Sequence, residues 1–386
     1  MKKRILLGIL IILFVVPGCS KKIESTESFD GKLNLEELIS NQEDDADARS
    51  ENCCPVCDIG EGAYLVETDE FGNFLYYYDY ASKQYTKVCS KPECEHKDDS
   101  CNAFFPNGMD DEHEYFDSIQ WYDGAILVGG LDKQKACIYK IEGDGSGQEK
   151  LIDLFDAQIE EEIDEGSTTT SYSAFKFCAH RGYIYYSVEE GEATSFCRKA
   201  IDGKGQEEQI VAPTSDKSIV YRVEPYGRYV FFQQGEYNDD YSAINSKLCA
   251  YDTETGAIID IKDQIVCSYQ IKDNHIYYEV MGEGIHDYSL ENNTDHLVAE
   301  SDEIFYQIYK AGNFFIAASQ FGFSIFDDEG MLVKEIEKGT NCDLFYANDQ
   351  VIIASYGDGN GNHVTAFVTN LEDDVENWSW EELVIK

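Results

Sequence analysis

The sequence predicts an all-β fold, a β-propeller of about seven four-stranded blades, with six or eight blades as the alternatives. The first observation is a recurring phrase of two apolar-alternating runs joined by a short turn that contains Gly, Asn or Asp. The second is the spacing of these turns, which suits one propeller blade per repeat. The third is composition, because 27 Tyr and 21 Phe against 6 Pro favour strands.

Residues 1–18 have the layout of a lipoprotein signal peptide. Basic residues precede an apolar run, residues 5–16, which is shorter than the roughly 20 residues that a membrane-spanning helix requires. The segment 16–19 resembles a bacterial lipobox, with Pro17 as an unusual member. We therefore expect cleavage before Cys19 and a lipid on its sulfur, whose two acyl chains give stable anchoring. The alternative is a secreted protein in which Cys19 is unmodified.

Residues 19–60 are expected to form an acidic, flexible tether with a cysteine-rich end. The segment is rich in Ser, Asp, Glu and Asn, a composition that disfavours a packed core. Its end contains Cys53, Cys54 and Cys57. The mature chain is thus expected on the extracytoplasmic face of the bacterial cell membrane, held to the lipid membrane through Cys19.

Residues 61–386 are expected to form the propeller. Each copy of the first phrase is a hairpin, because Gly, Asn and Asp supply the φ > 0 conformations of tight turns. The copies lie at 64–80, 116–130, 174–190, 220–234, 268–280, 305–319 and 343–357.

A second hairpin phrase follows most copies and completes four strands per repeat. Clear examples are YKIEGDGSGQEKLIDL at 139–154 and RKAIDGKGQEEQIV at 198–211. Successive turns are roughly 40–60 residues apart, as in propeller blades. The first copy is one strand short, and WEELVIK at 380–386 is expected to help close the ring against the first blade. The acidic residues 160–165 are expected to form a solvated loop between strands.

These phrases, the lipobox and the block at 75–105 together resemble uncharacterised β-propeller lipoproteins of Gram-positive anaerobes. The resemblance covers nearly the whole chain and implies no known activity. More loosely, the DGSGQ and DGKGQ hairpins are similar to those of the YWTD propellers of low-density-lipoprotein receptors, although the YWTD tetrapeptide is missing.

The stretch CSKPECEHKDDSC at 89–101 is a candidate metal site. Its Cys89, Cys94, His96 and Cys101 make a Cys3His set, which suits structural zinc. The alternative is disulfide bonding among these cysteines and the three at the tether's end, since the compartment is extracytoplasmic. A third interpretation is a redox centre at the C-x-x-C spacing of residues 54–57, where neighbouring carboxylates would oppose thiolate formation. The spacing favours a structural staple over an active centre.

The remaining cysteines after residue 101 lie in strand phrases and are expected to be small buried hydrophobic residues.

The net charge of −45 excludes a nucleic-acid partner, because phosphate contacts require a basic surface. The leading hypothesis is a binding module whose propeller face engages a protein, peptide or glycan. One alternative is a lyase or hydrolase with its site at the axis, for which the seven scattered His would have to converge. Another is a structural subunit of an envelope complex. No catalytic residues are assigned, and the sequence favours binding over catalysis.

Overall fold

The structure, a computed structural model, describes a defined part of the chain. The described residues are 33, 38, 56–105, 113–132, 135–156, 159–164, 167–172, 176–190, 193–238, 244–262, 264–319, 322–337, 343–357, 363–368, 371 and 375–382. The signal peptide, most of the tether, and Cys19, Cys53 and Cys54 lie outside them.

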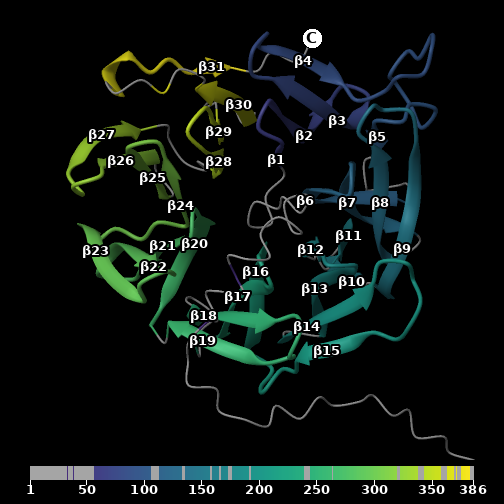
Figure 1. Cartoon of the computed structure of the whole chain (residues 1–386). Helices are drawn as coiled ribbons and strands as arrows, with labels where there is room; N and C mark the ends of the chain where they lie inside the picture. The colour runs from purple at the N-terminus through teal and green to yellow at the C-terminus, as the bar shows by residue number, and fades with distance from the viewer. Residues whose placement is uncertain are drawn as a thin grey trace, which may run out of the picture.

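Seven antiparallel sheets are arranged as blades around one axis (Figure 1). Six of these sheets have four strands in sequence order, and the first has a fifth strand, β5. In each blade the first strand lies nearest the axis and the fourth lies toward the rim (Figure 1). The predicted all-β propeller is confirmed, and its blade number is seven.

Blades 1 to 3 contain the following strands. Blade 1 comprises β1 (Val56–Asp58), β2 (Gly62–Asp69), β3 (Gly72–Asp79), β4 (Gln84–Lys87) and β5 (Phe104–Phe105). Blade 2 comprises β6 (His113–Tyr122), β7 (Ala125–Asp132), β8 (Lys135–Glu142) and β9 (Gln148–Asp156). Blade 3 comprises β12 (Phe177–His180), β13 (Tyr183–Glu190), β14 (Ala193–Ala200) and β15 (Glu208–Val211).

Blades 4 to 7 complete the ring. Blade 4 comprises β16 (Ser218–Tyr226), β17 (Tyr229–Tyr237), β18 (Ile244–Asp252) and β19 (Ile258–Lys262). Blade 5 comprises β20 (Val266–Lys272), β21 (His275–Val280), β22 (Gly284–Ser289) and β23 (Thr294–Glu300). Blade 6 comprises β24 (Gln307–Ala311), β25 (Phe314–Ser319), β26 (Gly322–Asp327) and β27 (Leu332–Glu337). Blade 7 comprises β28 (Asp343–Ala347), β29 (Ile352–Gly357), β30 (His363–Val368) and β31 (Glu381–Glu382).

The turn chemistry follows the sequence pattern. At the β6–β7 turn, Asp123 and Gly124 have φ of 49° and 74°. At the β20–β21 turn, Asp273 and Asn274 have φ of 52° and 64°. Two consecutive residues with φ > 0 are the requirement of the tightest hairpin turns, which match the twist of the strands they join.

The hydrophobic core lies between neighbouring blades. Successive side chains of a strand point to opposite faces, and in these sheets both faces carry apolar side chains. These side chains interdigitate with those of the neighbouring blades. Between blades 3 and 4, for example, the buried rings of Phe196 and Phe232 have centroids 4.7 Å apart. Burying such a side chain stabilises the fold by about 1.5–3 kcal/mol.

Blade 1 departs from the sequence expectation in two ways. Its innermost strand β1 lies within residues assigned to the end of the tether, because Val56 and Cys57 are buried and pair with Leu65 and Tyr64. The outermost strand is divided: β4 pairs with residues 76–79 of β3, and β5 pairs with residues 73–74. Residues 89–101 are therefore an insertion into the rim strand of blade 1.

The ring closes through contacts between blades 7 and 1. The Asp58 carboxylate accepts hydrogen bonds from the Tyr346 hydroxyl at 2.8 Å and the Asn348 amide at 3.0 Å. One hydrophobic cluster includes residues of β1, β2 and β3 together with those of blades 6 and 7. The last strand, expected to help close the ring against the first blade, is described as β31, which pairs with β30 of its own blade. It contacts blade 1 through the Lys83–Glu381 ion pair.

A small additional sheet replaces one predicted loop. Of the acidic run 160–165, expected as a solvated loop, residues 160–164 belong instead to β10 (Ile159–Asp164), which pairs with β11 (Ser167–Tyr172) in a separate two-stranded sheet. Glu165 lies outside the described residues. The Thr and Ser residues of β11 supply β-forming partners for the acidic strand.

Helix is scarce in the described part of the chain, where it consists of the 3-10 turn η1 (Val375–Asn377) and the helical residue Leu38. Among the described residues, no helix has the length and hydrophobicity that crossing a bilayer requires.

Candidate functional site

The structure brings the four predicted metal ligands together. The donor atoms of Cys89, Cys94, His96 and Cys101 all lie within 4.8 Å of one another. The His96 Nδ1 lies 3.3 Å from the Cys101 Sγ. In a zinc tetrahedron with donor distances of about 2.1 and 2.3 Å, that edge measures about 3.6 Å. A Cys3His cluster able to hold a metal is therefore present.

Short backbone turns bend the loop around this point. The Cys94 amide donates to the Lys91 carbonyl at 3.3 Å, and the Cys101 amide donates to the Asp98 carbonyl at 3.0 Å. His96 has a φ of 54°, in the left-handed region where non-glycine residues are uncommon. This conformation, which costs roughly 1–3 kcal/mol, accompanies the placement of the His96 ring beside the three cysteines.

The loop is attached to blade 2 through the β8–β9 turn. The Gly145 carbonyl accepts hydrogen bonds from the Ser90 amide at 3.1 Å and from the buried Asn102 side chain at 2.8 Å. Gly145 has a φ of 71°, and a Cβ there would lie 2.8 Å from the Cys89 nitrogen. Glycine at this position lets the two backbones approach closely. The cluster thus lies at a junction between two blades.

The protein environment shifts the pKa values of the Cys89 and Cys101 thiols in opposite directions. Burial raises the pKa of the Cys101 thiol to about 12, despite a hydrogen bond from the Ala103 amide. Burial also acts to raise the pKa of Cys89, but hydrogen bonds from the Lys91 and Asn102 amides and from the Cys94 and Cys101 thiols together outweigh it, and the pKa lies below its usual value. Amides directed at a sulfur favour thiolate, the form that binds a metal.

Four of the six cysteines in the disulfide alternative lie among the described residues. Cys89, Cys94 and Cys101 are not disulfide-bonded. Cys57 lies outside the four-residue cluster, in β1, where its sulfur accepts a hydrogen bond from the Trp121 amide at 2.9 Å. Cys53 and Cys54 lie outside the described residues. Of the C-x-x-C pair, the structure therefore describes only Cys57.

The other described cysteines lie in strands, as expected. Four of them are buried and Cys267 is half-buried, whereas Cys342 lies outside the described residues. The buried members are Cys137, Cys178, Cys197 and Cys249.

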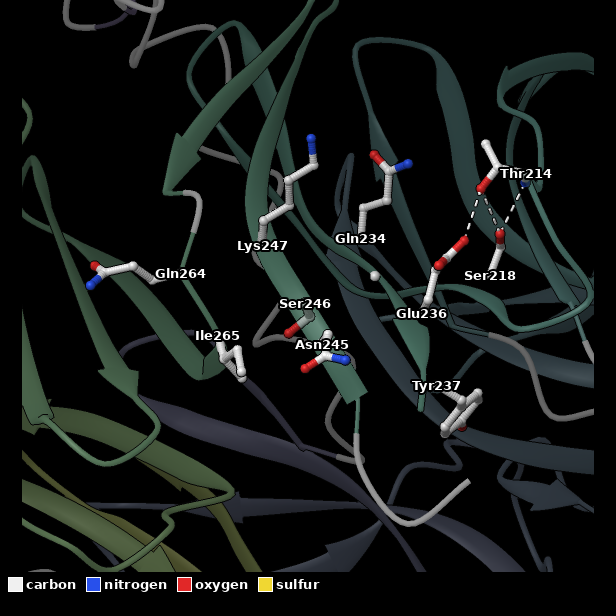
Figure 2. A pocket seen from close by; sticks show the side chains of 11 residues that line it. Thr214, Ser218, Gln234, Glu236, Tyr237, Asn245, Ser246, Lys247, Gln264 and Ile265 are labelled. Atoms are coloured by element: carbon white, nitrogen blue, oxygen red, sulfur yellow. Dashed lines mark hydrogen bonds between the residues drawn. The ribbon is translucent and has the colours of Figure 1, made fainter. Parts of the chain in front are cut away.

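A polar pocket of about 400 Å³ lies at the end of the β17–β18 hairpin (Figure 2). Three chain segments enclose it: the hairpin, the connection that leads into β16, and the connection from β19 into β20. Its lining comprises Thr214, Ser218, Gln234, Gly235, Glu236, Tyr237, Asn245, Ser246, Lys247, Gln264 and Ile265.

Strand register explains which side chains face the pocket. Gln234 pairs with Lys247, and Glu236 pairs with Asn245, so all four lie on one face of the hairpin. Farther along the same face, Phe232 and its partner enter the core between blades 3 and 4. The pocket therefore begins where this face changes from apolar to polar.

The two charged side chains of the pocket have internal partners. The Glu236 carboxylate accepts hydrogen bonds from the Thr214 hydroxyl at 3.1 Å and the Ser215 hydroxyl at 3.0 Å (Figure 2 shows the first). The Lys247 Nζ lies 2.8 Å from both oxygens of Asp260. The Lys247 charge is thus compensated by Asp260, whereas the Glu236 charge is stabilised by hydroxyl groups.

Three of the described histidines outside the Cys3His cluster make polar contacts in their own or an adjacent blade. His180 bonds the Gly227 carbonyl at 2.8 Å, between blades 3 and 4. His275 and Asp287 lie 2.6 Å apart within blade 5, where His286 lies 3.4 Å from Glu283. These three histidines thus lie in separate local contacts.

Similarity to known proteins extends to the fold alone. No family model matches the sequence, and no curated protein matches it. Among solved structures, one from a study of two prolyl endopeptidases is similar to this chain, with a TM-score of 0.54 and 10% sequence identity. The similarity covers 90% of this chain and 51% of the solved chain. A puromycin hydrolase gives a TM-score of 0.52 and 10% identity, over 88% of this chain and 54% of that one. A puromycin-hydrolysing peptidase of Mycobacterium tuberculosis gives 0.52 and 10%, over 89% and 54%. The chain thus spans about half the length of these three structures.

The Cys3His cluster was predicted from the sequence, whereas the pocket was not. The signal available was the change from Val230, Phe231 and Phe232 to Gln233 and Gln234 within one strand. Such a change marks the end of a core-facing stretch, but it does not identify the two distant connections that complete the pocket.

Proposed function

We propose that this chain is a lipid-anchored binding protein on the extracytoplasmic face of a bacterial cell membrane. The observation that carries the proposal is the polar pocket formed by three segments at one end of blades 4 and 5. Loops presented by a rigid propeller are suited to recognition, and concave sites with convergent polar groups are the usual ligand sites. The ligand classes that this site suits are a glycan, a peptide or a protein segment.

In this proposal the Cys3His cluster holds zinc, with the thiolates of Cys89, Cys94 and Cys101 and the Nδ1 of His96 as ligands. Four protein donors fill a tetrahedral site, which leaves no open position for substrate. The metal then serves a structural purpose: it closes the insertion in the rim strand of blade 1 against the β8–β9 turn of blade 2.

The anchor is the lipid on Cys19, followed by the tether. A net charge of −45 disfavours adsorption to anionic lipid, so attachment to the membrane depends on the lipid. The same charge disfavours nucleic acid as a partner. The resemblance to uncharacterised propeller lipoproteins of Gram-positive anaerobes agrees with this assignment.

We expect Cys19→Ala to abolish anchoring. Without the thiol, the lipid cannot be attached, so the variant should be found in the medium or remain uncleaved in the membrane. Cell fractionation with immunoblotting, together with the mass of the N-terminal peptide, measures both outcomes. A Cys19→Ala protein that is processed normally and stays membrane-bound would contradict the lipid anchor.

We expect ligand binding at the pocket to be blocked by Asn245→Trp. Asn245 is exposed at the pocket, so a bulky ring there should occupy the space without disturbing the core. Ligand-detected NMR on a mixed pool of neutral saccharides, short peptides and amino acids should show binding to the wild type and its loss in the variant. Gln84→Trp, at an exposed position at the start of β4, is the control. If no compound binds the wild type, or if every binder is retained by Asn245→Trp, the proposed function is wrong.

A further inference from the structure

The pocket is lined mainly by uncharged polar groups. The lining includes the carboxamide residues Gln234, Asn245 and Gln264 and the hydroxyl residues Thr214, Ser218 and Ser246. The Gln264 amide donates to Glu283 at 3.1 Å and the Ser246 hydroxyl donates to the Val266 carbonyl at 2.7 Å, so the groups that remain for a ligand come chiefly from Gln234 and Asn245. A volume of about 400 Å³ lies within the range of roughly 300–1,000 Å³ typical of small-ligand sites. This composition suits a ligand rich in hydroxyl groups.

The charges of the pocket disfavour an anionic ligand. Lys247, its only basic lining residue, is paired with both oxygens of Asp260. Glu236 adds a negative charge that is stabilised by hydroxyl groups rather than by a cation. A carboxylate or phosphate would therefore lose its hydration without gaining a compensating charge. A neutral ligand avoids this cost.

Two carboxamides are placed to bracket such a ligand. Gln234 and Asn245 occupy diagonal positions across the β17–β18 pair, since their direct partners are Lys247 and Glu236. Diagonal neighbours are about 7–8 Å apart, a spacing that a sugar ring can bridge. Each carboxamide has two N–H donors and an acceptor oxygen, which matches hydroxyls that both donate and accept. Within the described residues, the Asn245 carboxamide has no hydrogen-bond partner of its own.

Tyr237 lies at the end of β17 and lines the edge of the pocket (Figure 2). It follows Glu236 directly, so strand alternation directs its ring to the opposite face of the hairpin from Gln234 and Asn245. The recognition groups of the site are therefore the carboxamides rather than an aromatic ring. A peptide would instead require deeper apolar subsites or an unpaired strand edge, and β17 and β18 are both paired on either side.

We infer that the pocket at the end of the β17–β18 hairpin binds a neutral saccharide. The inference rests on the proposed function and names its ligand class. Gln234 and Asn245 act as the hydrogen-bonding residues.

The test is a titration of the purified mature chain with maltose, cellobiose, lactose and N,N′-diacetylchitobiose, monitored by NMR and calorimetry. Glucuronic acid and an uncharged blocked tetrapeptide are the comparison probes. At least one neutral disaccharide should bind, and Gln234→Ala and Asn245→Ala should each weaken its binding about tenfold or more, since each removes hydrogen bonds to the ligand. Gln84→Ala, an exposed carboxamide on blade 1, should leave the affinity unchanged.

Three outcomes would overturn the inference. If none of the four disaccharides binds, or if binding is unaffected in both variants, the saccharide assignment is wrong. If glucuronic acid binds as tightly as the neutral sugars, the argument from charge is wrong. If the tetrapeptide binds in place of the sugars and the variants abolish its binding, the ligand class is wrong while the pocket remains a binding site. Failure of every probe in the mixed pool as well would overturn the proposed function itself.

Discussion

His96→Ala is expected to release the metal from the Cys3His cluster and to destabilise blade 1. The substitution removes one of four ligands and leaves three buried or half-buried thiols around a vacated point. Structural zinc contributes roughly 10–16 kcal/mol of apparent binding free energy in small domains, whereas a typical disulfide contributes about 2–4 kcal/mol. Since the insertion is also held by hydrogen bonds to Gly145, only part of the zinc contribution should appear in folding. We expect a loss of at least about 3 kcal/mol in the free energy of unfolding.

Denaturant unfolding of the wild type and His96→Ala, each with and without a chelator, measures this effect. The chelator should destabilise the wild type and leave His96→Ala unchanged. The matched control is His296→Ala, because His296 is exposed on β23 of blade 5, away from the cluster. Hydrogen exchange should show the loss of protection concentrated in blade 1 and the β8–β9 turn. If disulfides hold the insertion instead, His96→Ala should be nearly silent and chelator-insensitive.

Glu279→Gln is expected to stabilise the protein at alkaline pH. Glu279 lies in β21, fully buried and paired in register with Ser268 of β20. Burial raises the pKa of its carboxyl from 4.5 to about 7, and the nearby Cys267 thiol and Phe305 amide offset this only in part. The ionised form is therefore the one that the folded state disfavours.

The sign of the pH dependence follows from the raised pKa. Below about pH 4.5 the carboxyl is protonated in both the folded and the unfolded state and costs nothing, whereas stability is lost as the pH rises toward about 7. Above that pH the full cost is present, about 3 kcal/mol, because each tenfold change in the ionisation constant corresponds to about 1.4 kcal/mol. Glu279→Gln cannot ionise, so its advantage over the wild type should be absent near pH 4 and grow to about 3 kcal/mol by about pH 8.

Unfolding free energies of the two proteins between about pH 4 and pH 8 test this prediction. The difference between them is the informative quantity, because the many surface carboxylates affect both equally. Glu300→Gln, at an exposed position on β23, should track the wild type at every pH. A constant difference between Glu279→Gln and the wild type would show that the buried carboxyl does not titrate in this range.

The blade architecture could be predicted because each hairpin is determined by residues that are close together in the sequence. Each hairpin carries its own turn residues, such as Asp123-Gly124, and its own alternation of apolar side chains. Repetition of the pattern at blade-like spacing then predicts the propeller. Strand β1 could not be predicted in this way because it is very short and follows a polar segment. Its residue Asp58 is held by hydrogen bonds to residues of blade 7, which are distant in the sequence.

The metal cluster could be predicted from the sequence and the pocket could not, because the first lies within one short stretch and the second combines distant segments. All four ligands of the metal cluster fall within one stretch, 89–101, so their residue types and spacing can be read together. What could not be read is that the loop interrupts a rim strand, since β4 and β5 join the same partner only in three dimensions. The pocket needs the register of Gln234 with Lys247 and two connections from neighbouring blades. Such a site becomes visible only after the blades are assembled.

The measurement that tests the central claim most directly is the metal content of the purified protein, combined with the redox state of its cluster thiols. The chain should be prepared without chelators or added metal and analysed by elemental mass spectrometry, with thiol alkylation and peptide mapping on the same sample. We predict one equivalent of zinc per chain, with Cys89, Cys94 and Cys101 reduced and alkylated only after the metal is removed. Zinc at well under one equivalent, with these cysteines found in disulfides, would contradict the metal centre.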